Sequence, residues 1–274
     1  ERTRRQFMLY MHSKGYFLAE VRDTVILRNN KALVHYTVRG NQAYHIRNIR
    51  LNIRDDHVAG FIGADIENSL LRSGQRYDAD ILQKERERVT RFMRSQGFFH
   101  FSRDFITFQI DSTLGTHQAD IEMTVHNPPT VRGSQSDTLS RPRHRRFVIN
   151  QVQIFPDFNA FSPQADYADT TLFRPGRSDQ GPAFVFLHNG PMRIRPQAIT
   201  SNILLEPGQH YAIGQVEQTH NYLSGLRNFR FINIQFIEAR GLENERTDTT
   251  GMLNARVQLT RAPTYAYTIE AEGL

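Results

Sequence analysis

The sequence contains no cysteine and no tryptophan. Without cysteine there are no disulfides and no thiolate metal sites, a composition that fits an oxidising compartment as well as a reducing one. No apolar run approaches the roughly 20 residues that a membrane-spanning helix needs. The basic N-terminus is not followed by the apolar stretch of a signal peptide. With 39% hydrophobic residues, the chain can still build a globular core.

Sequence motifs for catalysis and cofactor binding are also missing. There is no glycine-rich phosphate loop and no Gly-x-Ser-x-Gly nucleophile motif. The eleven histidines are scattered, and no two of them have the i, i+4 spacing of a helical zinc site. Paired acids such as Asp55-Asp56 are typical of helix caps. We therefore expect a protein that is not an enzyme, with no metal and no cofactor.

Positive charge exceeds negative charge, with a net charge of +6 and a pI near 9.8. This balance permits nucleic acid or an anionic membrane surface as a partner, but the excess arginine is spread along the chain. The densest charge lies between Arg141 and Arg146. That cluster fits either a solvated loop or a contact with anionic lipid or a partner.

The stretch from Leu71 to Asn127 has the pattern of one α+β module. Apolar residues recur on one face of a helix predicted over 79–96, which Asp78 or Asp80 caps and Gly97 ends. An aromatic strand is predicted over 98–110 and an alternating strand over 117–127. A strand over 44–53 and a helix over 56–72 precede them, which completes the order strand–helix–helix–strand–strand.

The same order recurs before and after this module. Residues 1–42 supply its second helix and last two strands, with a hairpin turn at Asn29-Asn30-Lys31, so this module is expected to be cut at its front. The Pro/Ser/Arg-rich segment 129–146 is expected to be a linker. Residues 147–263 form a third module, and the aromatic residues within 156–197 predict an ordered insertion in it. The second module occupies residues 43–128.

Residues 264–274 differ from the rest. Tyr265, Tyr267 and Ile269 alternate with polar residues, as in a barrel strand with one face toward lipid and one toward water. We interpret this stretch as the start of a first outer-membrane barrel strand, with the rest of that barrel missing from the chain.

The recurring order resembles that of the POTRA domain, the polypeptide-transport-associated module of outer-membrane assembly factors in the BamA/TamA superfamily. The resemblance rests on short motifs around the second helix of each module, where a glycine lets the helix turn sharply into a strand. They are Gly74-Gln75-Arg76-Tyr77 and Gly208-Gln209-His210-Tyr211 before the helix, and Gly15-Tyr16-Phe17, Gly97-Phe98-Phe99 and the looser Gly225-Leu226-Arg227-Asn228-Phe229 after it.

Within the superfamily, the linker, the insertion and the C-terminal stretch look like those of the TamL type of Bacteroidota, with the BamA type as the close competitor. The resemblance implies a periplasmic arm attached to the outer membrane through a C-terminal barrel. Such an arm receives unfolded outer-membrane or surface proteins as clients and guides them to the barrel. A TamB-like or other periplasmic assembly protein is the expected partner.

The resemblance also implies a mode of binding, β-augmentation, in which an extended client pairs with an exposed strand edge. In such folds the second strand of a module is commonly the edge. The candidate client-binding residues are therefore Phe98, His100, Phe101, Arg103, Phe105 and Phe108 in the second module, and Phe229, Phe231, Ile234 and Phe236 in the third.

An alternative function is nucleic-acid binding by an α+β repeat protein that uses basic and aromatic strands. The aromatic run after Gly97, with Arg103 nearby, resembles a stacking surface. Core packing explains the same residues, because Phe99, Phe101 and Phe105 share one parity of the predicted strand. A stacking surface would leave several of these rings exposed, whereas a core would bury one parity.

Overall fold

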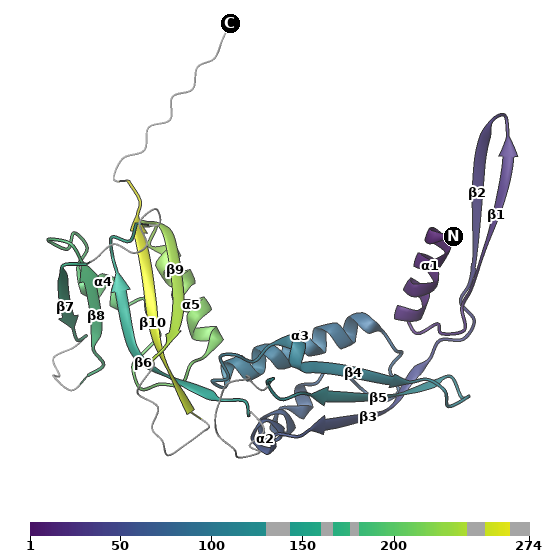
Figure 1. Ribbon diagram of the computed structural model, residues 1–274, viewed down its shortest axis with the longest axis horizontal. Coiled ribbons are helices and arrows are strands. Elements are labelled where there is room, and N and C mark those ends of the chain that lie inside the picture. The colour runs from purple at the N-terminus through teal and green to yellow at the C-terminus, as the bar shows by residue number, and fades with distance from the viewer. Residues whose placement is uncertain (130–142, 160–166, 176–180, 240–249, 264–274) are drawn as a thin grey trace, which may run out of the picture. The chain divides into compact units, whose positions relative to one another are not determined.

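A computed structural model describes residues 1–129, 143–159, 167–175, 181–239 and 250–263 (Figure 1). The chain divides into a first unit, Glu1–Met93 with Phe101–His144, and a second unit, Arg94–His100 with Arg145–Leu274. Helices accompany a mixed sheet in both units, so the predicted α+β class is confirmed. The predicted barrel strand at 264–274 and residues 130–142 of the predicted linker lie outside the described residues.

The first unit begins with a helix and a two-stranded hairpin. Helix α1 (Arg2–Ser13) is followed by β1 (Glu20–Arg28) and β2 (Lys31–Arg39), which pair antiparallel along their whole length. Asn29 and Asn30 have φ angles of 51° and 56°. Two successive left-handed residues make the two-residue turn that matches the twist of a hairpin, so the turn predicted here is confirmed.

The remainder of the first unit is a strand–helix–helix–strand–strand module. The middle strand of its sheet is parallel to the first strand and antiparallel to the other. Alternate residues of this middle strand, from Ala119 to Val125, are buried, as the sequence pattern predicts. In chain order the elements are β3 (His45–Ile53), α2 (Asp56–Ala64), η1 (Ile66–Asn68), α3 (Ala79–Ser95), η2 (Arg103–Phe105), β4 (Ile106–Asp111) and β5 (Gln118–Val125), with order β3-β5-β4 in the sheet.

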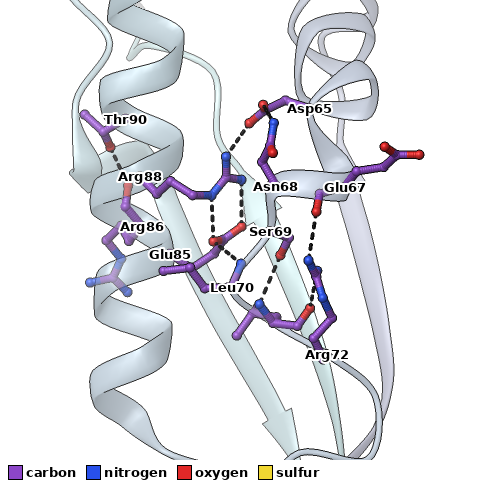
Figure 2. Close-up of polar contacts among 11 residues, drawn as sticks. Asp65, Glu67, Asn68, Ser69, Leu70, Arg72, Glu85, Arg86, Arg88 and Thr90 are labelled. Atoms are coloured by element: carbon purple, nitrogen blue, oxygen red, sulfur yellow. Dashed lines mark hydrogen bonds and ion pairs between the residues drawn. The ribbon is translucent and has the colours of Figure 1, made fainter.

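The helix predicted over 56–72 is wrong beyond Ala64, where α2 ends. Figure 2 shows the physical reason. The Asp65 carboxylate accepts a hydrogen bond from the Asn68 amide at 2.7 Å and from the Arg88 guanidinium of α3. These contacts bind the chain to α3 in a short 3-10 turn, which replaces the last turns of the predicted helix.

Glu85 of α3 holds the segment that follows. Its carboxylate accepts the backbone N–H of Leu70 at 2.8 Å and two guanidinium N–H groups of Arg88 at 2.9 Å (Figure 2). The side chain is almost fully buried. Burial acts to raise the Glu85 pKa, but the hydrogen bonds from Arg88, Leu70 and Ser69 and the positive charge of Arg88 outweigh it, so the pKa lies below its ordinary value. Glu85 is therefore a buried, ionised anchor for the connection between α2 and α3.

The strand predicted over 98–110 is also wrong in its first half. Strand β4 begins at Ile106, and a 3-10 turn that the Ser102 hydroxyl caps precedes it. Aromatic residues favour strands, but here the rings serve packing instead. Phe98 and Phe101 are buried, and Phe101 lies with Phe105 against the His144 ring at centroid distances of 5.0 and 4.8 Å.

The second unit has the same order of elements, with two added strands. The described parts of the segment 156–197 contribute β7 and β8, which extend the sheet beyond the first strand of the module. Ile199 and Leu223 of the helices are buried against Ile149, Ile154 and Val257 of the sheet. The elements are β6 (Arg146–Phe155), β7 (Asp169–Phe173), β8 (Phe184–His188), α4 (Pro196–Thr200), α5 (Ile213–Gly225), β9 (Phe229–Glu238) and β10 (Thr250–Arg261), with order β7-β8-β6-β10-β9 in the sheet.

The two complete modules repeat one set of backbone hydrogen bonds. The Gly-Gln-x-Tyr segment before the longer helix pairs with the first strand in both, and the donor–acceptor distances agree. In the first unit the bonds are Gly74 N to Ile46 O at 2.7 Å, Ile46 N to Gln75 O at 2.8 Å and Tyr77 N to Tyr44 O at 2.9 Å; in the second they are Gly208 N to Ile149 O, Ile149 N to Gln209 O and Tyr211 N to Phe147 O at the same distances.

The glycine after the helix of the preceding module makes a repeated contact as well. The Gly15 carbonyl accepts the N–H of Tyr44 at 2.8 Å, and the Gly97 carbonyl accepts the N–H of Phe147 at 2.8 Å. Both glycines have positive φ, 84° and 101°. The glycines that the sequence marks as helix ends thus also bind the first strand of the next module.

Candidate strand-edge binding sites

Strand β4 is an open edge of the sheet in the first unit. Among the described residues it pairs only with β5. The Phe105 carbonyl accepts the N–H of His126 at 2.8 Å, and bonded and non-bonded pairs alternate along an antiparallel ladder. By that alternation, the backbone N–H groups of Ile106, Phe108 and Ile110 point away from β5. They are the donors that an added strand would use.

The two faces of β4 differ. Ile106 is buried, Phe108 packs at the edge of the core below the Arg86 guanidinium, 5.6 Å from its ring centroid, and Ile110 is exposed. The other face carries the exposed residues Thr107 and Gln109. A strand that adds to this edge therefore meets an apolar side and a polar side, as in an ordinary half-buried sheet.

The predicted binding residues before β4 are not on this edge. Phe98 and Phe101 are only 1% and 3% exposed, so neither ring is free to contact a client or a base. His100 and Arg103 are exposed, but they lie outside the strand. No exposed stack of aromatic rings lies along this stretch, which does not favour the nucleic-acid alternative.

Strand β9 is the corresponding edge in the second unit and pairs only with β10 among the described residues. The pairing shifts between Thr260 and Arg261, so that one bulge separates Phe229 from the rest of the strand. Phe229 is buried, and Ile234 and Phe236 pack against the core. Phe231 lies on the other face, where its ring stacks on Phe158 with a centroid distance of 6.1 Å. Sequence alternation alone does not reveal this change of face.

Side chains cover one end of β9. The Glu238 carboxylate lies 2.6 Å from the His100 ring nitrogen, and the Phe236 and Phe99 ring centroids are 5.6 Å apart. Phe99 also packs edge-on against Tyr211 at 5.1 Å. His100, one of the predicted residues, therefore contacts a side chain at the end of β9 and is itself not part of an edge strand. The open part of β9 lies around Asn233 and Gln235.

The sequence did not predict two further edges. In the first unit, β3 pairs with no strand other than β5 among the described residues. The Gly74–Tyr77 segment bonds to the start of its other side, at Ile46, and the rest of that side is an edge. In the second unit, β8 pairs with the equivalent strand β6, and β7 becomes the edge. Strand pairing decides which edges are open, and alternation within one strand carries no signal for it.

Charge is concentrated at the end of the first sheet. Arg47 binds the Asp120 carboxylate with two bonds at 2.9 and 2.7 Å, and this lowers the Asp120 pKa to about 2. Asp111 of β4 lies opposite Asp120 in the ladder. Arg47 therefore offsets a like-charge pair that would otherwise weaken the end of the β4 edge.

The described residues include no group of three or more histidine, cysteine, aspartate or glutamate side chains that are close enough to hold a metal ion. A polar pocket of about 410 Å³ in the second unit is lined by residues that include Asp157, Arg193 and Arg261. Arg261 is paired with Asp157 there. None of the helices in the described ranges is long and apolar enough to cross a membrane.

The chain is similar to solved structures of other proteins at low sequence identity. No family model and no curated protein matches the chain. It is similar to the POTRA3–5 region of BamA from Haemophilus influenzae, with a TM-score of 0.46, 13% identity, and coverage of 92% of this chain and 76% of that one. It is also similar to BamA from Haemophilus ducreyi lacking POTRA domains 1–3, with a TM-score of 0.49, 9% identity, and coverage of 81% of this chain and 30% of that one. A third similar structure is POTRA1–3 of Omp85 from Anabaena, with a TM-score of 0.32, 12% identity, and coverage of 95% of this chain and 81% of that one.

Proposed function

We propose that the chain is a non-enzymatic periplasmic arm of an outer-membrane protein assembly factor, built from tandem POTRA modules. The observation that carries this proposal is the repeated module, in which the Gly-Gln-x-Tyr segment makes the same three backbone hydrogen bonds in both units. The motifs of the sequence and the order of the sheet strands support it together. The arm acts by binding, because its open edges present unpaired backbone donors.

The proposed ligand is an extended client polypeptide that adds to β4 or β9 as a further strand. Backbone hydrogen bonds supply most of the affinity, so the site accepts many client sequences. On β4, the outward N–H groups of Phe108 and Ile110 bind the client backbone, while Thr107 and Gln109 stay on the polar face. On β9, the outward N–H groups of Ile232 and Ile234, which lie next to Asn233 and Gln235, do the same.

Photocrosslinking in cells tests the proposal. A photoreactive residue at Thr107, Gln109 or Gln235 is expected to crosslink to outer-membrane or surface protein precursors. Glu87, which is exposed on α3, is the matched control and is expected to give no such product. Equal products from Glu87 and the edge positions would contradict edge binding, and crosslinks to nucleic acid would contradict the proposed function as a whole.

A backbone variant separates edge pairing from side-chain contact. Ile110→Pro removes one outward N–H and leaves the ladder with β5 intact, because that N–H does not point toward β5. It is expected to reduce crosslinking at Thr107 and Gln109 at least about tenfold, which corresponds to the loss of roughly 1.4 kcal/mol of binding free energy. Ile110→Val keeps the N–H and is expected to bind normally. Similar loss in both variants would mean that the side chain, and not the strand edge, binds the client.

The finer assignment to the TamL type of Bacteroidota, rather than the BamA type, is part of the proposal. It predicts a TamB-like periplasmic protein as a stable partner. Affinity purification of the natural protein from its own host, with the outer-membrane fraction as starting material, tests it. Recovery of a TamB-like protein supports the TamL type, and recovery of lipoproteins without it supports the BamA type.

A further inference from the structure

A polar pocket lies at the carboxyl ends of three neighbouring strands in the second unit. Strands β6, β8 and β10 are parallel to one another, so their carboxyl ends lie at the same end of the sheet (Figure 1). Loops that leave the carboxyl ends of parallel strands often form a crevice that binds a ligand. Here the pocket has a volume of about 410 Å³, and its lining includes Asp157, Phe158, Asn189, Arg193, Thr260 and Arg261.

The segment after β6 forms one wall of this pocket and is bound to the end of β10. The Phe158 N–H donates to the Leu259 carbonyl at 2.9 Å, and the Thr260 hydroxyl donates to the Phe158 carbonyl at 2.6 Å. The Asp157 carboxylate accepts a hydrogen bond from Arg261. The Phe158 ring is buried. This wall is therefore held by contacts of both backbone and side chains.

The turn after β8 forms the other wall. The Gly190 N–H donates to the Asp169 carboxylate at 2.8 Å, and the Gly190 carbonyl oxygen lies 2.7 Å from the Nδ1 of His188. The Asn189 side-chain oxygen accepts the N–H of Ala168 at 2.9 Å. Both walls are thus formed before a ligand arrives, which lowers the entropic cost of binding one.

The charges in the lining favour an anion. Asp157 pairs with Arg261, so one carboxylate stands against two guanidinium groups and the lining is positively charged. Arg193 is exposed, and its side chain forms no ion pair or hydrogen bond with the part of the chain that the structure describes. Its planar guanidinium therefore keeps its N–H donors available for an anionic ligand.

A phosphate matches these donors better than a carboxylate does. Arg193 belongs to the turn after β8 and Arg261 to the end of β10, so the two guanidinium groups come from different walls. Phosphate is tetrahedral and presents oxygens in several directions, whereas a carboxylate presents its oxygens in one plane. The volume of about 410 Å³ lies within the range of about 300–1,000 Å³ that is typical of small-molecule sites, which leaves room for an organic group beside the phosphate.

We propose that this pocket binds the phosphate group of a phosphate ester. The Arg193 guanidinium is the main donor, and Arg261 contributes the N–H groups that Asp157 does not occupy. The organic part of the ester contacts Phe158 and Pro191, which also line the pocket. A soluble phosphate ester and a lipid headgroup share this chemistry. The inference is independent of the proposed client binding, because the pocket includes no residue of β4 or β9.

Titration of the 274-residue chain with glycerol 3-phosphate, followed by NMR of the backbone amides, tests the proposal. Saturable shifts are expected at residues 157–158, 189–193 and 260–261. Arg193→Gln is expected to weaken binding at least about tenfold, because it removes the charged donor. Arg195→Gln makes the same change of charge at an exposed position outside the lining and is expected to change the affinity less than about twofold.

A substitution at Asp157 is expected to have the opposite effect. Asp157→Asn keeps an acceptor for Arg261 but removes the negative charge beside the ligand, so binding of glycerol 3-phosphate is expected to strengthen at least about threefold. Damage to the fold cannot produce tighter binding, so this variant distinguishes an electrostatic role from a structural one. Unchanged or weaker binding by Asp157→Asn would overturn the proposal.

Vesicles distinguish the two sources of the phosphate. A headgroup site predicts that the chain sediments with phosphatidylglycerol vesicles, and that Arg193→Gln lowers this binding while Arg195→Gln does not. A site for a soluble ester predicts that only the binding of glycerol 3-phosphate depends on Arg193. The proposal is overturned if glycerol 3-phosphate shows no saturable binding, or if Arg193→Gln and Arg195→Gln weaken its binding equally.

Discussion

Glu85 and Thr219 occupy the same place in the two complete modules, although one is a carboxylate and the other a hydroxyl. Each lies buried on the longer helix and accepts the backbone N–H of a leucine fifteen residues earlier, at 2.8 and 2.9 Å. The segment between the helices leaves this N–H without a partner in secondary structure. A helix side chain therefore satisfies a part-buried donor, and leaving that donor unpaired would cost about 1–3 kcal/mol.

Removal of the Thr219 hydroxyl is expected to destabilise the second unit. Thr219→Val keeps the shape of the side chain but leaves the Leu204 N–H unpaired, which costs about 1–3 kcal/mol. Thr219→Ser keeps the acceptor and serves as the control, with a smaller loss from the missing methyl group. Hydrogen exchange of residues 203–206 measures the effect. Equal protection in the two variants would show that the hydroxyl does not hold this segment.

Acid is expected to weaken the connection between α2 and α3. The pKa of Glu85 lies below its ordinary value of 4.5 in the folded chain, so its contribution to stability is complete above pH 4.5 and is lost as the pH falls through the folded pKa. Exchange of residues 65–72 is therefore expected to accelerate below pH 4.5. Glu85→Gln is expected to be less stable at pH 7 and to show a smaller change below pH 4.5. Parallel pH profiles for the two proteins would contradict this role.

His144 is expected to hold residues 143–146 in place against the first unit. Its ring Nε2 lies 3.0 Å from the His126 carbonyl oxygen, and the ring packs on Phe101 and Phe105. Its backbone N–H donates to the Asp55 carboxylate at 3.1 Å. Burial lowers the His144 pKa below its ordinary 6.5. Stability from the neutral ring is thus complete above pH 6.5 and is lost as the pH falls through the folded pKa.

An NMR titration of the His144 ring measures this pKa directly. His144→Phe keeps the aromatic packing but loses the bond to the His126 carbonyl, and it is expected to exchange residues 143–146 faster at pH 7 with a weaker dependence on pH. His144→Ala loses both contacts and is expected to exchange them faster still. A ring pKa at or above 6.5 would refute the burial argument.

Alanine substitutions at Gly15 and Gly74 distinguish the cost of steric crowding from the cost of backbone strain. Their φ angles are 84° and 82°, but a Cβ at Gly15 would lie 2.7 Å from the Tyr77 carbonyl oxygen, whereas a Cβ at Gly74 meets nothing within 4 Å. Gly74→Ala is expected to cost about 1–2 kcal/mol for the left-handed conformation alone. Gly15→Ala is expected to cost more, because the Tyr77 backbone must also move. Thermal unfolding of both variants tests this, and equal losses would show that the contact yields freely.

The sequence predicts the module order because its signals are local. The two Gly-Gln-x-Tyr segments precede helices with apolar faces, and Asn29-Asn30 marks the hairpin turn. Helix α3 ends at Ser95, one residue before the predicted end. Each of these features depends on residues that are neighbours in the chain, so periodicity and turn chemistry are sufficient to find them.

The errors arise where distant residues decide the structure. Ile66 and Leu70 continue the apolar pattern of a helix, but Arg88 and Glu85 bind this segment in another conformation. The rings of Phe99 and Phe101 suggest one strand, yet Phe99 packs with Tyr211 in the second unit and Phe101 with His144 in the first. Of the six binding positions predicted for the second module, only Phe108 lies within β4, and the other five precede the strand.

The pairing of β8 with β6 has a consequence for self-association. An unpaired strand edge adds to any matching edge, including that of another copy, and long flat edges are the usual start of aggregation. Strand β6 of the second unit corresponds to β3 of the first. The side of β6 away from β10 is occupied by β8, a strand of the same chain, whereas β3 has no strand at that side among the described residues. The strand that takes its place at the rim, β7, is only five residues long. The insertion thereby lowers the risk of fibre-like stacking while β9 stays accessible.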